Sequence, residues 1–279
     1  MRIVKRSAAV ALALLMMFTM FAVSSSAAKK QNYLLLGDSI AYGQGLANSE
    51  DACYGKIVAD TNGYNYKNYA VSGTTSGALL AYIDQDFVTA GIKEANIISI
   101  SIGGNDFLTQ NLPLLLAGAK LGIDAQFDYI EGKFAENFSD IIAKIKKINP
   151  SVSIFVQTVY NPNDSFVSDA YQKGVDVLNG VIKNYLSSNK GAFRIVDVEK
   201  AFAGHHEYIA SDTIHPNAKG NLVIAKETLK ALKNAKLGSS TTPVVKTEAI
   251  DWNNARGSYG NIFSYYFNLI LGYIGKIFA

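Results

Sequence analysis

The sequence has few of the residues that hold disulfide-rich or metal-bound folds together: one cysteine and three histidines among 279 residues. A single cysteine, Cys53, cannot form an internal disulfide, so stability must come from a hydrophobic core. A hydrophobic content of 49% is sufficient for such a core. No histidine is near Cys53 in sequence, and we therefore expect a small buried residue there rather than a nucleophile.

A charge excess is also absent once the N-terminal segment is set aside. Residues 1–28 combine three basic side chains near the start, a charge-free apolar run from Ala8 to Val23 and a small-residue stretch that ends at Ala28. This pattern predicts a secretory signal peptide cleaved near Ala28, and hence a secreted or cell-surface protein; the alternative is an uncleaved membrane anchor. The remaining 23 basic residues equal the 23 acidic ones, so electrostatics give no case for nucleic-acid binding.

Five apolar runs are predicted to be strands, and helical patterns separate them. The predicted strands are Tyr33–Leu36, Tyr64–Val71, Ile97–Ile102, Ser153–Val159 and Phe193–Val198. Amphipathic spacing predicts helices over Phe138–Ile148, Asp169–Leu186 and Ala218–Leu232. Strands that alternate with helices favour an α/β fold with a parallel sheet and right-handed crossovers. No internal repeat is visible.

The composition changes near residue 236, which divides the chain into parts. We expect one globular domain over 29–236 and a linker over 237–261, which opens with a stretch rich in glycine, serine and threonine. Residues 262–279 are aromatic and aliphatic, with Lys276 as their only charge. They are interpreted either as a segment that contacts a membrane surface or a partner, or as a tail helix packed on the domain. The sequence assigns no oligomeric state.

The residues for nucleophilic catalysis lie near the two ends of this domain. Ser39 follows the first predicted strand, which Gly37 interrupts, so its hydroxyl is expected on a sharp turn where α/β sheets carry their chemistry. His215 is the candidate general base, and Asp212, three residues earlier, is the candidate carboxylate that orients it. Asp197, at the end of the fifth strand, is the alternative carboxylate.

An oxyanion needs hydrogen-bond donors from other strand ends, and two loops can supply them. Gly73 follows the second strand and Asn105 follows the third. Together with the Ser39 N–H they form a candidate oxyanion hole. Asp38 and Asp106 are expected to fix their turns rather than to catalyse. The cluster His205-His206-Glu207 lacks the spacing of a zinc helix, so we expect a solvated loop and no metal site.

Four blocks, in order, resemble the SGNH/GDSL hydrolase family over residues 31–236: Gly37-Asp38-Ser39, Gly73, Gly103-Gly104-Asn105-Asp106 and Asp212-Thr213-Ile214-His215. The resemblance implies a flavodoxin-like three-layer α/β/α fold around a central parallel sheet. It also implies Ser39 as nucleophile, Asp212 and His215 as its partners, and Gly73 and Asn105 in the oxyanion hole. The Gly-x-Ser-x-Gly elbow of α/β-hydrolases is absent.

These features predict a secreted serine esterase or lipase that hydrolyses lipid or short-chain acyl esters through an acyl-enzyme on Ser39, without metal or cofactor. One alternative is an esterase that removes acetyl groups from carbohydrate or cell wall. Another, suggested by residues 262–279, is a surface-anchored binding protein with a vestigial site. Aromatic and apolar side chains near the blocks are candidates for an acyl pocket, namely Tyr42, Phe107 and Leu108, with Phe166 and Tyr208 as further candidates.

Overall fold

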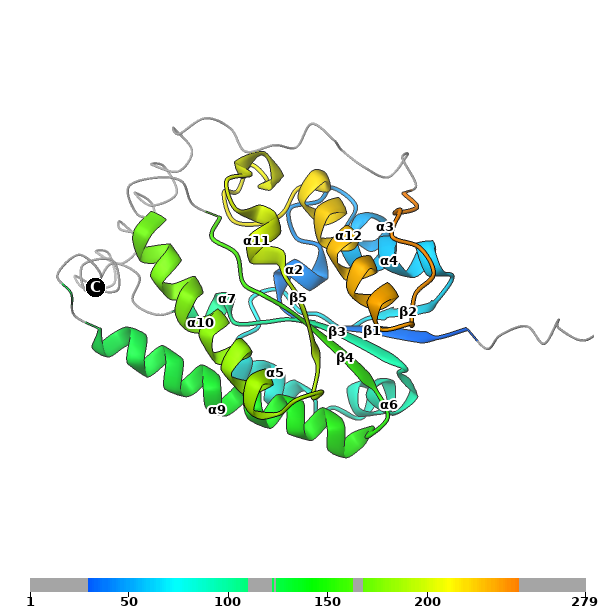
Figure 1. The fold of residues 1–279 in the computed structure, drawn as a ribbon, viewed down its shortest axis with the longest axis horizontal. Coiled ribbons are helices and arrows are strands. Elements are labelled where there is room, and N and C mark those ends of the chain that lie inside the picture. The colour runs from blue at the N-terminus through cyan, green and yellow to red at the C-terminus, as the bar shows by residue number, and fades with distance from the viewer. Residues whose placement is uncertain (1–29, 110–121, 123, 163–167, 246–279) are drawn as a thin grey trace, which may run out of the picture. The chain divides into compact units, whose positions relative to one another are not determined.

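The computed structural model describes residues 30–109, 122, 124–162 and 168–245 (Figure 1). The strands are β1 (Asn32–Gly37), β2 (Asn65–Asn68), β3 (Ile97–Ser101), β4 (Ser153–Gln157) and β5 (Arg194–Val196). The longer helices are α4 (Tyr54–Asn62), α5 (Ser76–Tyr82), α6 (Asp86–Glu94), α9 (Ala125–Ile148), α10 (Ser168–Ser188) and α12 (Ala218–Asn234). Short helical turns complete the described chain: α2 (Ser39–Tyr42), α3 (Ser49–Ala52), α7 (Gly104–Leu108), α11 (Val198–Phe202) and the 3-10 turn η1 (His206–Tyr208).

The five strands form one parallel sheet in the order β2-β1-β3-β4-β5. The predicted α/β fold with a five-stranded parallel sheet is thus confirmed. Because all strands run in the same direction, their carboxyl ends meet at one edge, and the loops that follow β1, β3 and β4 lie beside one another there. The order reverses between β1 and β3, which is where such folds place their binding crevice.

Helices cover both faces of the sheet, as the unbroken apolar strands require (Figure 1). Alternate residues of β1 enter two separate cores: Leu34 and Leu36 pack on one side, and Tyr33 and Leu35 on the other. The first core also holds buried side chains of α5, α6, α9 and α10, and the second those of α4, α11 and α12. The result is the expected three-layer α/β/α arrangement.

Four strands are shorter than the sequence predicts: β3 and β4 end one and two residues early, and β2 and β5 are shortened most. The edge strand β2 pairs with β1 alone and ends at Asn68, whose side-chain amide donates to the Ala41 carbonyl oxygen at 2.9 Å. β5 ends at Val196 because Asp197 accepts a hydrogen bond from the Lys200 N–H and caps α11. Beyond Asn68, the N–H groups of Tyr69 and Val71 still donate to the Leu35 and Gly37 carbonyl oxygens of β1 at 2.9 and 3.0 Å, so backbone bonds to β1 continue past the end of β2.

The first nine residues of the predicted linker lie against the domain. The Ser239 N–H donates to Asn62 Oδ1 at 3.0 Å, and the Val244 N–H donates to Thr61 Oγ1 at 2.9 Å, so 237–245 follows the end of α4. The predicted signal peptide over 1–28 and the apolar segment over 262–279 lie outside the described residues. Among the helices that are described, none has the length and hydropathy to cross a bilayer.

Candidate active site

The turn that carries Ser39 depends on the absence of a side chain at Gly37. Gly37 has a φ of 127°, and a Cβ on it would lie 1.9 Å from the Ser101 carbonyl oxygen of the neighbouring strand. Only glycine allows β1 to approach β3 this closely and then turn into α2. Asp38 caps α2 by accepting the Ile40 N–H at 3.0 Å, and it also accepts the Ser101 hydroxyl at 2.9 Å. Ser39 is therefore held at the carboxyl edge of the sheet.

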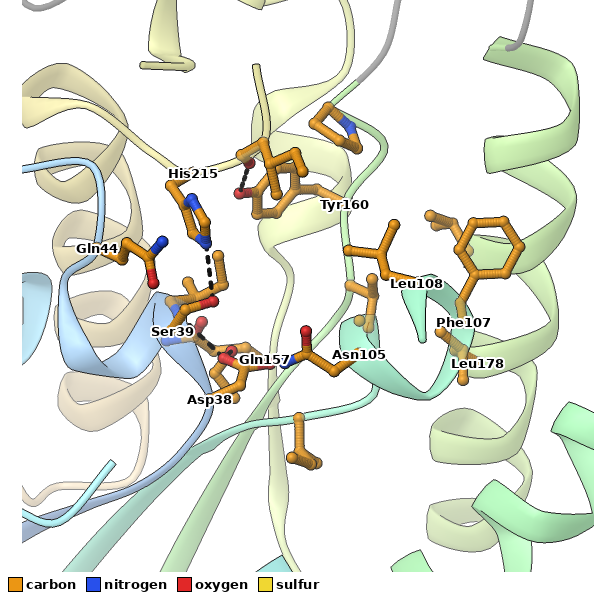
Figure 2. A pocket seen from close by; sticks show the side chains of 18 of the residues that line it. Asp38, Ser39, Gln44, Asn105, Phe107, Leu108, Gln157, Tyr160, Leu178 and His215 are labelled. Carbon is orange, nitrogen blue, oxygen red and sulfur yellow. Dashed lines mark hydrogen bonds between the residues drawn. The ribbon is translucent and has the colours of Figure 1, made fainter. Parts of the chain in front are cut away.

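The structure brings together the two ends of the domain at Ser39. The Ser39 hydroxyl oxygen lies 2.9 Å from Nε2 of His215, 176 residues away in sequence (Figure 2). Nδ1 of the same ring lies 2.7 Å from the Asp212 carboxylate. Ser39 is 7% exposed, so its hydroxyl is accessible only through the adjoining pocket. The three side chains form a continuous hydrogen-bonded chain.

The segment between Asp212 and His215 is a tight loop. The second oxygen of Asp212, Oδ1, accepts the backbone N–H groups of Ile214 at 3.0 Å and His215 at 2.9 Å. Thr213 adopts a left-handed φ of 70°, a strained conformation for a non-glycine residue, and this lets the carboxylate fold back on its own loop. The Tyr160 hydroxyl, from the loop after β4, donates to the Ile214 carbonyl oxygen at 2.6 Å and ties this loop to the sheet edge.

The charge of Asp212 is stabilised by these contacts. Burial alone would raise its pKa, but the hydrogen bonds from the His215 ring and from the two backbone N–H groups outweigh burial, so the pKa lies below its usual value. Asp212 is therefore ionised at neutral pH beside the imidazole. Asp197, the alternative carboxylate, caps α11 and is not in contact with His215.

The expected oxyanion donors lie in the lining of the same pocket. Gly73 and Asn105 both line it together with Ser39. Asn105 Nδ2 donates one hydrogen to the Thr74 carbonyl oxygen at 3.0 Å, which fixes the amide and leaves its second hydrogen unused. Among the hydrogen bonds of the described chain, none uses the backbone N–H of Ser39 or Gly73.

Asp106 holds the two donor loops together, as expected. Its carboxylate accepts the Ser76 N–H at 2.9 Å and also the Ser76 hydroxyl. Ser76 begins α5, directly after the loop of Gly73, whereas Asp106 lies in α7 beside Asn105. Burial is the main reason that the pKa of Asp106 is above its usual value, although both Ser76 contacts lower it. Asp106 thus positions the loops of Gly73 and Asn105 relative to each other.

A cavity of about 290 Å³ extends from Ser39 toward α10. Figure 2 shows Ser39 and His215 on one side of it and Phe107, Leu108 and Leu178 on the other. These three far-side residues are apolar, and the cavity lining also includes the apolar side chains of Ile102, Val159, Tyr171 and Val175. The cavity thus presents apolar surface in the direction away from Ser39.

Sequence comparisons identify the family of the chain. The model of the GDSL-like lipase/acylhydrolase family matches residues 35–223, which include every block described above. The chain belongs to this family. Among curated relatives, it is 28% identical over 218 residues to the uncharacterized protein YpmR of Bacillus subtilis, which covers 71% of this chain and 80% of that protein. It is 26% identical over 198 residues to the spore germination lipase LipC of Bacillus licheniformis, which covers 67% and 90%.

Solved structures show the same fold. The lipase Lip_vut3 from a goat rumen metagenome superimposes with a TM-score of 0.62 at 23% identity, over 75% of this chain and 99% of that one. At this level of identity the likeness concerns the fold of the GDSL-like hydrolase.

Two of the five expected pocket residues line the cavity, two lie elsewhere, and one is outside the described residues. Phe107 and Leu108 line the cavity of this GDSL-like hydrolase, as predicted, and Phe166 lies outside the described residues. Tyr42 is 47% exposed on α2, and Tyr208 packs on Phe202 and His205, so neither lines the cavity. Tyr42 was expected there because it is near the first block in sequence, and Tyr208 was a further candidate that the sequence alone did not place.

Sequence analysis did not identify Gln44, Gln157 or Tyr160 as site residues, yet all three line the cavity. Gln157 ends β4, and its buried Nε2 has no hydrogen-bond partner among the described residues. The positions of Gln157 and Tyr160 could have been predicted, because residues at and after the carboxyl ends of strands line the site in such folds. In the His205-His206-Glu207 cluster, Nδ1 of His205 lies 2.8 Å from Oε1 of Glu207. The described residues contain no group of side chains that could hold a metal ion.

Asp38 predicts an unusual pH dependence of stability for this GDSL-like hydrolase. Burial raises its pKa to about 6, although the Ser101 and Ile40 hydrogen bonds partly oppose the shift. Between about pH 4 and pH 6 the unfolded chain releases the proton while the folded protein keeps it, so stability falls as pH rises through this window. We expect Asp38→Asn, which retains the cap, to flatten this dependence and to raise the unfolding free energy at pH 7.5 by up to about 3 kcal/mol.

The measurement is guanidinium unfolding of both proteins at pH 4.5 and pH 7.5. The prediction concerns how much the unfolding free energy changes between the two pH values. A change in capping alone does not alter this difference. An equal stability difference between variant and parent at both pH values would contradict it.

Proposed function

We propose that this protein is a serine hydrolase that cleaves carboxylic esters through an acyl-enzyme on Ser39. The observation that carries the proposal is the chain of hydrogen bonds from the Ser39 hydroxyl through His215 to Asp212, at 2.9 and 2.7 Å. A hydroxyl, an imidazole and an ionised carboxylate in this order are the groups that acyl transfer requires. Membership of a lipase and acylhydrolase family supports the same reaction class.

In the first half of the reaction, Ser39 Oγ attacks the ester carbonyl carbon. Nε2 of His215 takes the hydroxyl proton as the new C–O bond forms, and Asp212 stabilises the resulting imidazolium. The tetrahedral intermediate then collapses: its bond to the alcohol oxygen breaks, and His215 gives its proton to that oxygen. The products are a free alcohol and an acyl group bonded to Ser39.

In the second half, water replaces the alcohol. His215 removes a proton from the water as its oxygen attacks the acyl carbon, and the second intermediate collapses with release of Ser39. The proton on Nε2 returns to Ser39 Oγ, so the enzyme is regenerated and the carboxylic acid leaves. Every proton is accounted for by His215 and water, and the mechanism needs no metal or cofactor.

Both intermediates carry a negative oxygen, which we assign to the Ser39 N–H, the Gly73 N–H and the unused hydrogen of Asn105 Nδ2. The two backbone N–H groups have no acceptor in the described chain, and the Thr74 carbonyl fixes the Asn105 amide. Donors held in place before the charge develops cost no reorganisation when it appears, and each typically contributes about 3 kcal/mol of barrier reduction.

The apolar end of the cavity favours an acyl chain over an acetyl group. An acetyl ester places only a methyl group beyond the carbonyl carbon, so Phe107, Tyr171 and Leu178 would remain without contact to it. A longer chain covers these side chains and gains apolar burial, about 0.8 kcal/mol for each methylene fully removed from water. We therefore propose lipid or short-chain acyl esters as substrates.

The test is a panel of esters with the purified protein. We expect kcat/KM on p-nitrophenyl esters to rise from acetate to butyrate and to exceed that on acetylated xylooligosaccharides. A fluorophosphonate probe is expected to label Ser39, as mapped by peptide mass spectrometry. Turnover of acetylated sugar without turnover of butyrate would favour the carbohydrate O-acetyl esterase instead, and labelling at another serine would contradict the proposed nucleophile.

We also propose that the protein is secreted and contacts a membrane surface, and both proposals rest on the sequence alone. The N-terminal pattern supports cleavage near Ala28 and secretion, and the apolar composition of 262–279 supports contact with a membrane surface. A lipid substrate is compatible with both features.

A further inference from the structure

The alcohol side of the site carries a polar side chain that the proposed reaction does not use. His215 must pass its proton to the departing oxygen, so the alcohol leaves on the side of Ser39 that faces His215. Figure 2 shows Gln44 on this side, across from Phe107, Leu108 and Leu178. The cavity therefore separates into an apolar acyl side and an alcohol side that includes Gln44.

Backbone contacts hold Gln44 at this position. Its N–H donates to the Ser39 carbonyl oxygen at 3.0 Å, directly behind the proposed nucleophile. The next residue, Gly45, has a φ of 95°, and a Cβ there would lie 2.9 Å from the His215 Cβ. The chain at residues 44 and 45 is thus packed against both ends of the hydrogen bond between Ser39 and His215.

The Gln44 side chain is oriented by Ser72. Its Oε1 accepts the Ser72 hydroxyl, from the loop that also carries Gly73. This contact uses the acceptor end of the amide, and no hydrogen bond among the described residues uses its Nε2 donors. Gln44 and Ser72 are both exposed at the mouth of the cavity and both line it. A fixed donor thus remains available where the alcohol must lie.

We propose that Gln44 selects esters whose alcohol carries a further hydroxyl close to the ester oxygen. A hydroxyl oxygen can accept the Nε2 hydrogen, and Ser72 Oγ lies beside it as a second polar atom; a plain alkyl alcohol offers neither contact. Polyols such as glycerol and sugars share this chemistry. The inference rests on the proposed esterase function, and it adds the class of alcohol to it.

The test compares glycerol monobutyrate and 6-O-butyryl glucose with propyl butyrate, all below their solubility limits. The acyl group is the same, so the acyl side contributes equally, and division by each ester's alkaline hydrolysis rate removes intrinsic reactivity. We expect kcat/KM for at least one hydroxylated ester to exceed that for propyl butyrate by about threefold to tenfold, the effect of one neutral hydrogen bond. Preference for one of the two identifies the source of the polyol.

Gln44→Met, which has a similar size and no amide, is expected to bring this ratio close to one. Ser72→Ala is expected to lower it in part, because the amide loses its anchor. The matched control is Gln85→Met, an exposed glutamine at the start of α6 outside the cavity lining, which should keep the parent ratio. Because the ratio compares two substrates on one preparation, a loss of folded protein does not change it.

A parent ratio near one, or a ratio that Gln44→Met leaves unchanged, would overturn the inference while the esterase function stands. Absence of turnover on all three esters would instead contradict the proposed function itself. The two failures are therefore distinguishable.

Discussion

Ser39→Ala is expected to reduce kcat on p-nitrophenyl butyrate by about 10⁴-fold to 10⁶-fold, because it removes the atom that would form the acyl-enzyme. The change should leave the fold intact. The Ser39 hydroxyl contacts His215, whereas the turn is built by Gly37, Asp38 and the Asp38 cap on Ile40. The thermal midpoint should therefore change little, and labelling by a fluorophosphonate should disappear.

The matched control is Ser187→Ala, an exposed serine near the end of α10 whose hydroxyl donates to the Asn184 carbonyl oxygen. It should keep the parent activity and labelling. If the parent protein and Ser39→Ala were equally inactive on a broad ester panel, the protein would better fit a surface-anchored binding protein with a vestigial site. Equal and substantial activity in both would place the nucleophile elsewhere.

The fold could be predicted from sequence because each signal that specifies it is local. The apolar runs of β1, β3 and β4 are buried on both faces, so an unbroken hydrophobic run is the pattern that their position requires. The ends of the two edge strands, β2 and β5, were less predictable. Asp197 ends β5 by capping α11, whereas backbone bonds to β1 continue at Tyr69 and Val71 beyond β2, and composition reveals neither feature.

The candidate site also has a part that could be predicted from the sequence and a part that could not. Ser39, Gly73 and Asn105 follow strands, and Asp212 is three residues from His215, so their types and spacing were visible in the sequence. The cavity lining was less predictable, because it depends on which helix faces the sheet edge. Leu178 and Val175 come from α10, some 70 residues after Phe107, and their helical spacing indicates only a buried face. Tyr42, which is next to the first block, instead faces solvent.

The orienting carboxylate gives the second large expected effect. Asp212→Asn should lower kcat on p-nitrophenyl butyrate by about 10³-fold to 10⁴-fold. Oδ1 of residue 212 accepts two backbone N–H groups, from Ile214 and His215, so the carbonyl oxygen of an asparagine must take this position. The amide nitrogen is then turned toward Nδ1 of His215, and it donates a hydrogen where the carboxylate accepted one.

A ring that accepts at Nδ1 carries its proton on Nε2, which faces Ser39. It cannot take the Ser39 proton in this tautomer, and the imidazolium also loses its counter-charge. The loss should therefore appear in kcat and in the rate of fluorophosphonate labelling, with a smaller change in KM and in the thermal midpoint. Both kinetic readouts depend on the proton transfer, which a merely structural role would not affect.

Asp197→Asn is the matched control, since asparagine caps a helix as well as aspartate does and the Lys200 N–H can still donate to it. It should retain parent activity. Asp212 and Asp197 both lie within 20 residues of His215 in sequence, but only Asp212 contacts the ring. Loss of activity in Asp197→Asn with near-parent activity in Asp212→Asn would reverse the assignment. Full activity in both variants would mean that His215 acts without a carboxylate, held by its backbone contacts and by the Tyr160 bond to its loop.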